Sequence, residues 1–156
     1  MIDTIATVAA EQAGDVNPVL DWHTFALGRY ATVAKDGYSI TVRIIDDNDV
    51  DIVPEIVNGE YSEGYPETAD GKPVYYFRVY AEIWIGAYTI GKDSLNCVGV
   101  TDMDDTYLTH MVPWEVIDGA IDSVDTLLPA SITIAEVRRD SIIADLDSMR
   151  AIASRL

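Results

Sequence analysis

VYYFRVYAEIWI, residues 74–85, alternates apolar and polar side chains, and this alternation decides the fold. A period of two places one set of side chains on each face of a β-strand, so the run is predicted to be a half-buried strand. Residues 88–100 follow after Gly86-Ala87 and are predicted to return as its antiparallel partner. Gly91 interrupts this second run and is interpreted as a β-bulge.

Two earlier runs, residues 29–34 and 38–46, alternate in the same way around Asp36-Gly37. An Asp-Gly dipeptide between alternating runs is typical of a tight hairpin. The sequence therefore predicts an antiparallel meander of about four strands. The connection from Asp46 to Pro73 is long and rich in Gly, Pro, Tyr and Glu, and a short edge strand is expected within it at residues 50–53.

Helical periodicity dominates the second half of the chain. One helix is predicted over residues 113–128, with a proline in its first turn and Pro129 as its stop. Thr133 and Glu136 have the spacing of a capping box and are predicted to begin the last helix. A short helix is also expected near the N-terminus, before Gly14. The apolar stripe of the last helix consists of Ile142, Leu146, Met149, Ala153 and Leu156.

These elements predict a single α+β domain over residues 1–156, in which the antiparallel meander packs against the two C-terminal helices. Packing onto the sheet is the expected use of the last helix's stripe. The alternative is a homodimer in which the stripe pairs with its counterpart, although the stripe runs for barely three heptads.

The chain is strongly acidic, with 27 Asp and Glu against 10 Lys and Arg and a formal net charge of −17. Such a charge repels nucleic acid and anionic membranes and favours basic partners. No apolar run reaches the ~20 residues that cross a bilayer, and Cys97 is the single cysteine. A soluble protein of the reducing cytoplasm is therefore expected.

The acidic residues are concentrated in two stretches, Asp46–Asp70 and Asp93–Glu136, each of which has nine acids and no Lys or Arg. In the second stretch, four acids recur at steps of three and four, which stacks them on one face of the predicted helix. Such a row resembles a track of nucleic-acid phosphates, and an ordinary solvated helix face is the simpler alternative. The four acids are Glu115, Asp118, Asp122 and Asp125.

The first stretch forms a second candidate contact surface, in which tyrosines among the acids are expected to act as aromatic anchors. Its candidate residues are Asp46, Asp47, Asp49, Asp51, Glu60, Tyr61, Glu63 and Tyr65. Asp47, Asp49 and Asp51 also have the first spacings of a calcium loop, but the glycine and the glutamate that such a loop needs are Ile52 and Asn58. A solvated acidic turn is the better interpretation.

Two other motifs are rejected as sites. Gly86, Gly91 and Lys92 match the spacing of a phosphate-binding loop, but no helix is predicted to follow, and Asp93 stands where the loop needs a hydroxyl. His110 lies near several acids, but Pro113 separates it from the helix that carries the acidic row. The sequence therefore predicts no catalytic residue, no metal site and no cofactor.

The stretch YYFRVYAEIWIGAYTIGKDSLNCVGV, followed by DDTYLTHMVPWEVIDGAIDSV, resembles small acidic accessory proteins of actinobacterial phages. The likeness covers residues 75–128 and consists of a hairpin followed by a helix. Those proteins are mostly of unassigned function, so the resemblance implies a phage origin and transfers no site residue. In charge and size the chain is also similar to DNA-mimicking anti-restriction and anti-CRISPR proteins.

The leading functional hypothesis is a non-enzymatic inhibitor in the host cytoplasm that binds the basic nucleic-acid-binding surface of another protein. One alternative is a phage assembly or structural protein that self-associates through its C-terminal helix. The other is a generic soluble domain whose acidity reflects adaptation to salt, as in halophiles.

Overall fold

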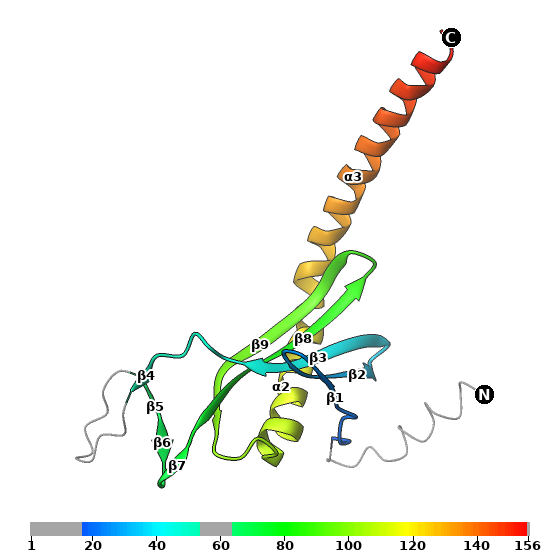
Figure 1. The fold of residues 1–156 in the computed structure, drawn as a ribbon. Helices are drawn as coiled ribbons and strands as arrows, with labels where there is room; N and C mark the ends of the chain where they lie inside the picture. The colour runs from blue at the N-terminus through cyan, green and yellow to red at the C-terminus, as the bar shows by residue number, and fades with distance from the viewer. Residues whose placement is uncertain (1–16, 54–63, 156) are drawn as a thin grey trace.

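A five-stranded antiparallel sheet is the centre of the computed structural model, which describes residues 17–53 and 64–155 (Figure 1). The spatial order of the strands is β1-β2-β3-β8-β9. The fold is α+β, as predicted, but the sheet has one strand more than expected because β1 pairs with the outer edge of β2. The strands are β1 (His23–Phe25), β2 (Gly28–Lys35), β3 (Tyr38–Asp46), β8 (Tyr75–Ile85) and β9 (Tyr88–Val100).

The predicted hairpin turn between β2 and β3 is confirmed. Asp36 and Gly37 both have positive φ, 51° and 81°, as a two-residue hairpin of the preferred twist requires. The hairpin of β8 with β9 carries two register shifts, one of which adjoins Gly91, so a bulge occurs where it was expected. The second shift lies opposite Phe77 and Val79 and was not foreseen.

An arm made of short strands extends from one end of the sheet, between β3 and β8 (Figure 1). It contains β4 (Ile52–Val53), which pairs in parallel with β5 (Tyr65–Pro66), and a small hairpin of β6 (Thr68–Ala69) with β7 (Lys72–Pro73). The strand expected at residues 50–53 therefore exists in part, but it joins the arm and not the main sheet. The helix expected before Gly14 lies outside the described residues.

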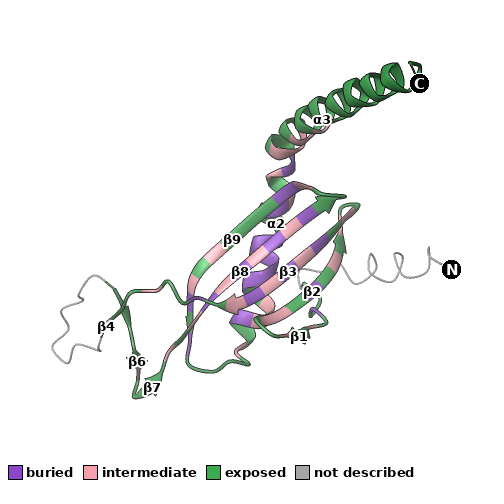
Figure 2. Ribbon diagram, turned by 45° about the horizontal axis from the view of Figure 1, so that its top comes forward, coloured by how far each residue is buried: buried purple, intermediate pink, exposed green. Residues whose placement is uncertain are grey.

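One face of the sheet is covered by helix α2 (Val112–Asp122), which follows a π-helical turn, η1 (Tyr107–Met111). The proline in the first turn of α2 is where it was predicted. Figure 2 shows buried residues along α2 and along the strands it covers. The core consists mainly of Ile40, Val42, Val79, Ala81, Val112, Val116, Ile117 and Ala120.

Gly91 allows α2 to lie very close to β9. A Cβ atom at Gly91 would come 2.5 Å from the Ala120 carbonyl oxygen and 2.9 Å from a Val124 methyl group. Both distances are shorter than van der Waals contact, so this site needs a residue without a side chain. The glycine that gave the stretch its likeness to a phosphate loop is therefore a packing site between helix and sheet.

Helix α3 (Val124–Ala153) projects from the sheet, and this differs from the sequence prediction in three ways (Figure 1). First, the predicted stop at Pro129 is wrong, since α3 continues through this residue, while the break falls at Ser123. Second, Thr133 does not cap a helix, because its hydroxyl donates to the Pro129 carbonyl oxygen inside α3 at 3.1 Å. Third, only the first turns of α3 pack against the sheet, so its later stripe does not.

Local contacts explain why α3 runs through a proline. Ser123 keeps right-handed helical dihedrals, so α3 follows α2 almost without interruption. Pro129 lies just after the first turn, where it removes one backbone hydrogen bond. On either side of it, Val124 is buried in the core and the Ser131 hydroxyl donates to the Thr89 carbonyl oxygen at 3.1 Å. These contacts hold both flanks of the proline in place.

Candidate interaction surfaces

The predicted acidic row lies on the outer side of α2 and continues into α3. All four of its carboxylates are exposed. Asp118 is the one member that bonds across to another element, because its carboxylate accepts from the Lys35 ammonium group of β2. Glu115, Asp122 and Asp125 keep their charge toward solvent.

A fifth carboxylate joins this row from the sheet. Asp93 of β9 lies over Gly119, where a Cβ atom would come 1.9 Å from the Asp93 Oδ2 atom. Gly119 is one helical turn from both Glu115 and Asp122, so the Asp93 carboxylate stands beside the row. Sequence reasoning did not include Asp93, because only the crossing of α2 over β9 brings it there. We call Asp93, Glu115, Asp118, Asp122 and Asp125 the acidic face.

The acidic stretch after β3 is built differently from the prediction. Asp47 is the one buried charged residue of the described chain, and its side chain is 1% exposed. Its Oδ1 accepts from Arg78 Nη2 at 2.9 Å, and its Oδ2 accepts from the Cys97 N–H at 2.9 Å. Asp47 therefore fastens this segment to β8 and β9 and presents no charge to a partner.

The surroundings of Asp47 also set its protonation. Burial opposes the charged form, but the Cys97 N–H, the Arg78 guanidinium and the Asp49 N–H together outweigh it and lower the pKa of Asp47 below 3.8. Arg78 also contacts Asp49 at 3.2 Å. Although the spacing of these acids resembles a calcium loop, the Arg78 guanidinium occupies the position between the Asp47 and Asp49 carboxylates.

Of the remaining candidates, Asp46 at the end of β3 and Asp49, Asp51 and Tyr65 beyond it are exposed. Tyr65 contacts the sheet even so, because its ring packs edge-on against Tyr76 at 5.5 Å. The neighbouring Cys97 side chain is the main cause of a raised Tyr65 pKa. Tyr65 thus anchors the arm. The other three candidates, Glu60, Tyr61 and Glu63, lie outside the described residues.

The two motifs rejected from the sequence, the phosphate-loop spacing of residues 86–94 and His110, both occupy structural positions. Residues 86–94 form a hairpin turn and the start of β9, so no helix N-terminus is available for a phosphate. His110 Nε2 is 2.7 Å from the Asn17 carbonyl oxygen and belongs to the packing of the N-terminal segment. Within residues 17–53 and 64–155, no group of three His, Cys, Asp or Glu side chains has the arrangement to hold a metal ion.

The face of the sheet opposite α2 carries aromatic and charged side chains that contact one another through hydrogen bonds and a cation–π interaction. Arg43 donates to Glu82 Oε2 at 2.6 Å and lies 5.5 Å from the centre of the Tyr80 ring. The Arg78 Nη1 atom donates to the Tyr80 hydroxyl at 3.2 Å. These contacts connect the polar groups of Arg43, Arg78, Tyr80 and Glu82 to one another on this face.

Helix α3 carries many of the exposed large apolar residues of the described chain. Only Val124 of this helix is buried, and Figure 2 shows exposed residues along nearly its whole length. Sequence reasoning placed this stripe against the sheet, and the structure corrects that. The exposed large apolar residues are Ile132, Ile134, Val137, Ile142, Ile143, Leu146, Met149 and Ile152.

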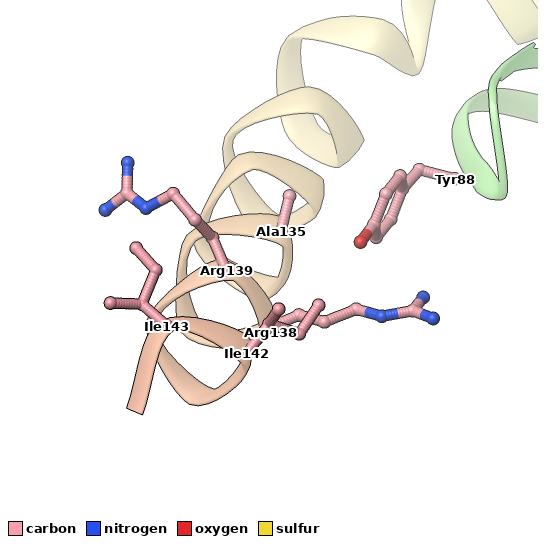
Figure 3. A pocket seen from close by; sticks show the side chains of 6 residues that line it. All are labelled: Tyr88, Ala135, Arg138, Arg139, Ile142 and Ile143. Carbon is pink, nitrogen blue, oxygen red and sulfur yellow. The ribbon is translucent and has the colours of Figure 1, made fainter. Parts of the chain in front are cut away.

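A groove of about 430 Å³ lies between α3 and the tip of the β8–β9 hairpin. Figure 3 shows Tyr88 of the hairpin facing α3 near Ala135, with Arg138 and Ile142 on the next turn. The lining is almost entirely apolar, and Arg139 and Ile143 complete it. The groove was not predicted because it forms only where the helix passes the hairpin.

Comparisons with protein-family models, with curated proteins and with solved structures gave no match to this chain. Among the helices of the described residues, none is long and apolar enough to cross a membrane.

Proposed function

We propose that this protein is a non-enzymatic component of a protein assembly and that α3 is the element by which it is held there. The observation that supports this proposal is the exposure of the large apolar side chains of α3. Contiguous apolar surface of this kind marks sites of protein interaction. The proposal corresponds to the assembly alternative from the sequence, and a phage origin for it rests on the resemblance of residues 75–128.

The length of α3 strengthens the argument. It has 30 residues, of which only the first turns touch the sheet. In water, most of the stability of a helix comes from packing of its apolar face, so a projecting helix needs contacts with another chain. Val137 and Leu146 are nine positions apart and therefore lie on opposite sides of the helix. Exposed apolar side chains therefore lie on more than one side of α3 and offer contact surface in more than one direction.

Sedimentation of the tagged full-length chain in a native cell extract tests this proposal. The wild type should sediment in a complex well above its own mass of 17.1 kDa. A variant with Gln at Ile134, Val137, Ile142 and Leu146 should sediment as the free chain, because these side chains lie outside the core. Free wild-type chain in the extract would contradict the proposal.

A second candidate function is the acidic inhibitor that the sequence favoured. The observation in its favour is the acidic face, in which Asp93 adds a carboxylate from β9 to the exposed row on α2. A surface of this charge complements Lys and Arg side chains on a nucleic-acid-binding protein and would compete with phosphates there. Acidic clusters also occur as ordinary solvated surface, so this function comes second.

Binding to a basic peptide tests this second function. The triple variant Asp118→Asn, Asp122→Asn and Asp125→Asn should bind a Lys- and Arg-rich peptide at least several-fold more weakly, with a smaller dependence on salt. Asp46→Asn combined with Asp49→Asn and Asp51→Asn is the matched control, since it also removes three exposed charges, from the other acidic stretch. Equal losses in both variants would reject the acidic face as a specific contact.

A further inference from the structure

The uninterrupted course of α3 lengthens the apolar stripe found in the sequence. Because the helix does not end at Pro129, the stripe begins at Leu128, which also packs against the core of its own chain, and continues to Ala153 with alternating steps of four and three residues. This is the spacing of the core positions in a coiled coil. We call it the seam, and it consists of Leu128, Ile132, Ala135, Arg139, Ile142, Leu146, Met149 and Ala153.

The charge of α3 indicates which partner can cover the seam. Residues 129–155 contain four acids and four arginines and are therefore neutral, whereas the whole chain carries −17. A basic partner gains no attraction from a neutral surface, but a second copy of this chain can approach here without the repulsion it meets elsewhere. On this basis, and resting on the assembly function proposed above, we propose that α3 pairs with α3 of a second copy in antiparallel orientation.

The orientation follows from one residue in the seam. In a parallel pair, Arg139 would face Arg139 of the second copy across the core. In an antiparallel pair centred between positions 139 and 142, Arg139 faces Ile142 of the second copy and its guanidinium can reach solvent. The same alignment brings Arg138 within about two residues of Asp145 of the second copy, and the two are opposite charges at flanking positions.

The acidic bodies also favour the antiparallel pair. In a parallel pair both sheets would lie at the same end of the helices, and their negative charges would repel each other. Antiparallel pairing separates the bodies by the length of the seam, which is about 39 Å for residues 128–153. The groove beside Tyr88 fits this arrangement, because the small Ala135 in its wall leaves room for Leu146 of the second copy (Figure 3).

Light scattering on the purified full-length chain tests the pairing. The wild type should have twice the mass of one chain at tens of micromolar, and the variant Ile142→Gln with Leu146→Gln should be monomeric. The matched control is Ile134→Gln with Val137→Gln, which removes two exposed apolar side chains of the same helix outside the seam. Near-ultraviolet circular dichroism of the tryptophans verifies that each variant keeps its core.

Cysteine cross-linking in a Cys97→Ser background then tests the orientation. Antiparallel pairing places Ile132 opposite Met149 of the second copy, whereas the two Ile132 residues are about 25 Å apart. A mixture of the Ile132→Cys and Met149→Cys chains should therefore form a disulfide-linked dimer, while either chain alone should not. Rapid linking of Ile132→Cys to itself would overturn the orientation.

The outcomes separate this inference from the assembly function. A wild-type chain that is monomeric when purified, but part of a large complex in extract, would overturn self-pairing and leave the assembly function standing with a different partner. A chain that is monomeric in both settings would overturn both. Equal loss of dimer in the seam variant and its matched control would also overturn the seam as the interface.

Discussion

Arg78 on β8 donates a hydrogen bond of 2.9 Å to Asp47, which lies just beyond the end of β3. The Cys97 N–H of β9 donates to the same carboxylate, so one buried acid connects three neighbouring strands where the arm leaves the sheet. Cys97 has a positive φ of 58°, which turns its N–H toward Asp47 at the unforeseen bulge of β9. The acid, the guanidinium and the bulge form one structural unit.

Replacing Asp47 with Asn should destabilise the domain by about 1–3 kcal/mol at pH 7, since the neutral amide binds Arg78 and the Cys97 N–H less strongly. Because the pKa of Asp47 is lowered in the folded protein, the stability that its carboxylate contributes should depend on pH. The stabilisation is fully present above the unfolded pKa of about 3.9 and disappears as the pH falls through the lower folded value. Urea unfolding at pH 7, 5 and 3 measures it, and the difference between the two proteins should be smaller at pH 3 than at pH 5 and 7.

Asp49→Asn is the control for this experiment. Asp49 also contacts Arg78, but its side chain is 84% exposed, so its loss should change stability by less than about 1 kcal/mol. If both variants lost the same stability at every pH, the buried position of Asp47 would not be the cause.

Gly91→Ala should destabilise the domain by about 1–3 kcal/mol, because the new methyl group would press against the Ala120 carbonyl and force α2 away from β9. Gly119→Ala is the informative comparison. There the new methyl group meets the flexible Asp93 side chain, and the gain in helix propensity offsets its displacement, so the net change should stay within about 1 kcal/mol of zero. Thermal unfolding of both variants checks the contrast, and equal losses would contradict the close crossing at Gly91.

The sheet could be predicted well from the sequence because alternation is a local property. The pairing of residues 38–46 with 29–34 and of residues 75–85 with 88–100 needed only the period of two and the turn residues between the runs. The first strand, His23–Phe25, has three residues and too short a pattern to recognise. It pairs with β2 across the two-residue turn Ala26-Leu27, which has none of the Gly, Asn or Asp residues that usually mark such a turn.

The helices were less predictable because their ends depend on packing. Pro129 is a strong local stop signal, but the contacts of Val124 and Ser131 with the sheet keep the helix on both sides of it. The periodicity correctly identified the stripe of α3 but gave no information on what covers it. Likewise, the acidic row could be read from its spacing, whereas Asp93 joined it only through the crossing of α2 over β9.

Removing charge from the acidic face should stabilise the domain slightly, and the effect should differ between its members. Asp122→Asn and Asp125→Asn each relieve repulsion with neighbouring carboxylates and should gain about 0.2–0.5 kcal/mol at low salt. Asp118→Asn should gain nothing, because it also leaves Lys35 without its partner. Melting temperatures at low and at high potassium chloride measure this, and a difference that persists at high salt would contradict the electrostatic cause.

Pro129→Ala tests whether α3 is continuous in solution. In a continuous helix the substitution restores the hydrogen bond from residue 129 to the Asp125 carbonyl oxygen and removes the clash of the proline ring, which should stabilise the helix by about 1–3 kcal/mol. Hydrogen exchange should then slow over residues 129–135, while the strands exchange as in the wild type.

If the chain instead ended one helix at Leu128 and began another at Thr133, alanine would add helical residues and raise the helical circular dichroism. An unchanged helical signal with slower exchange therefore identifies the single helix, and a raised signal would show that α3 consists of two separate helices.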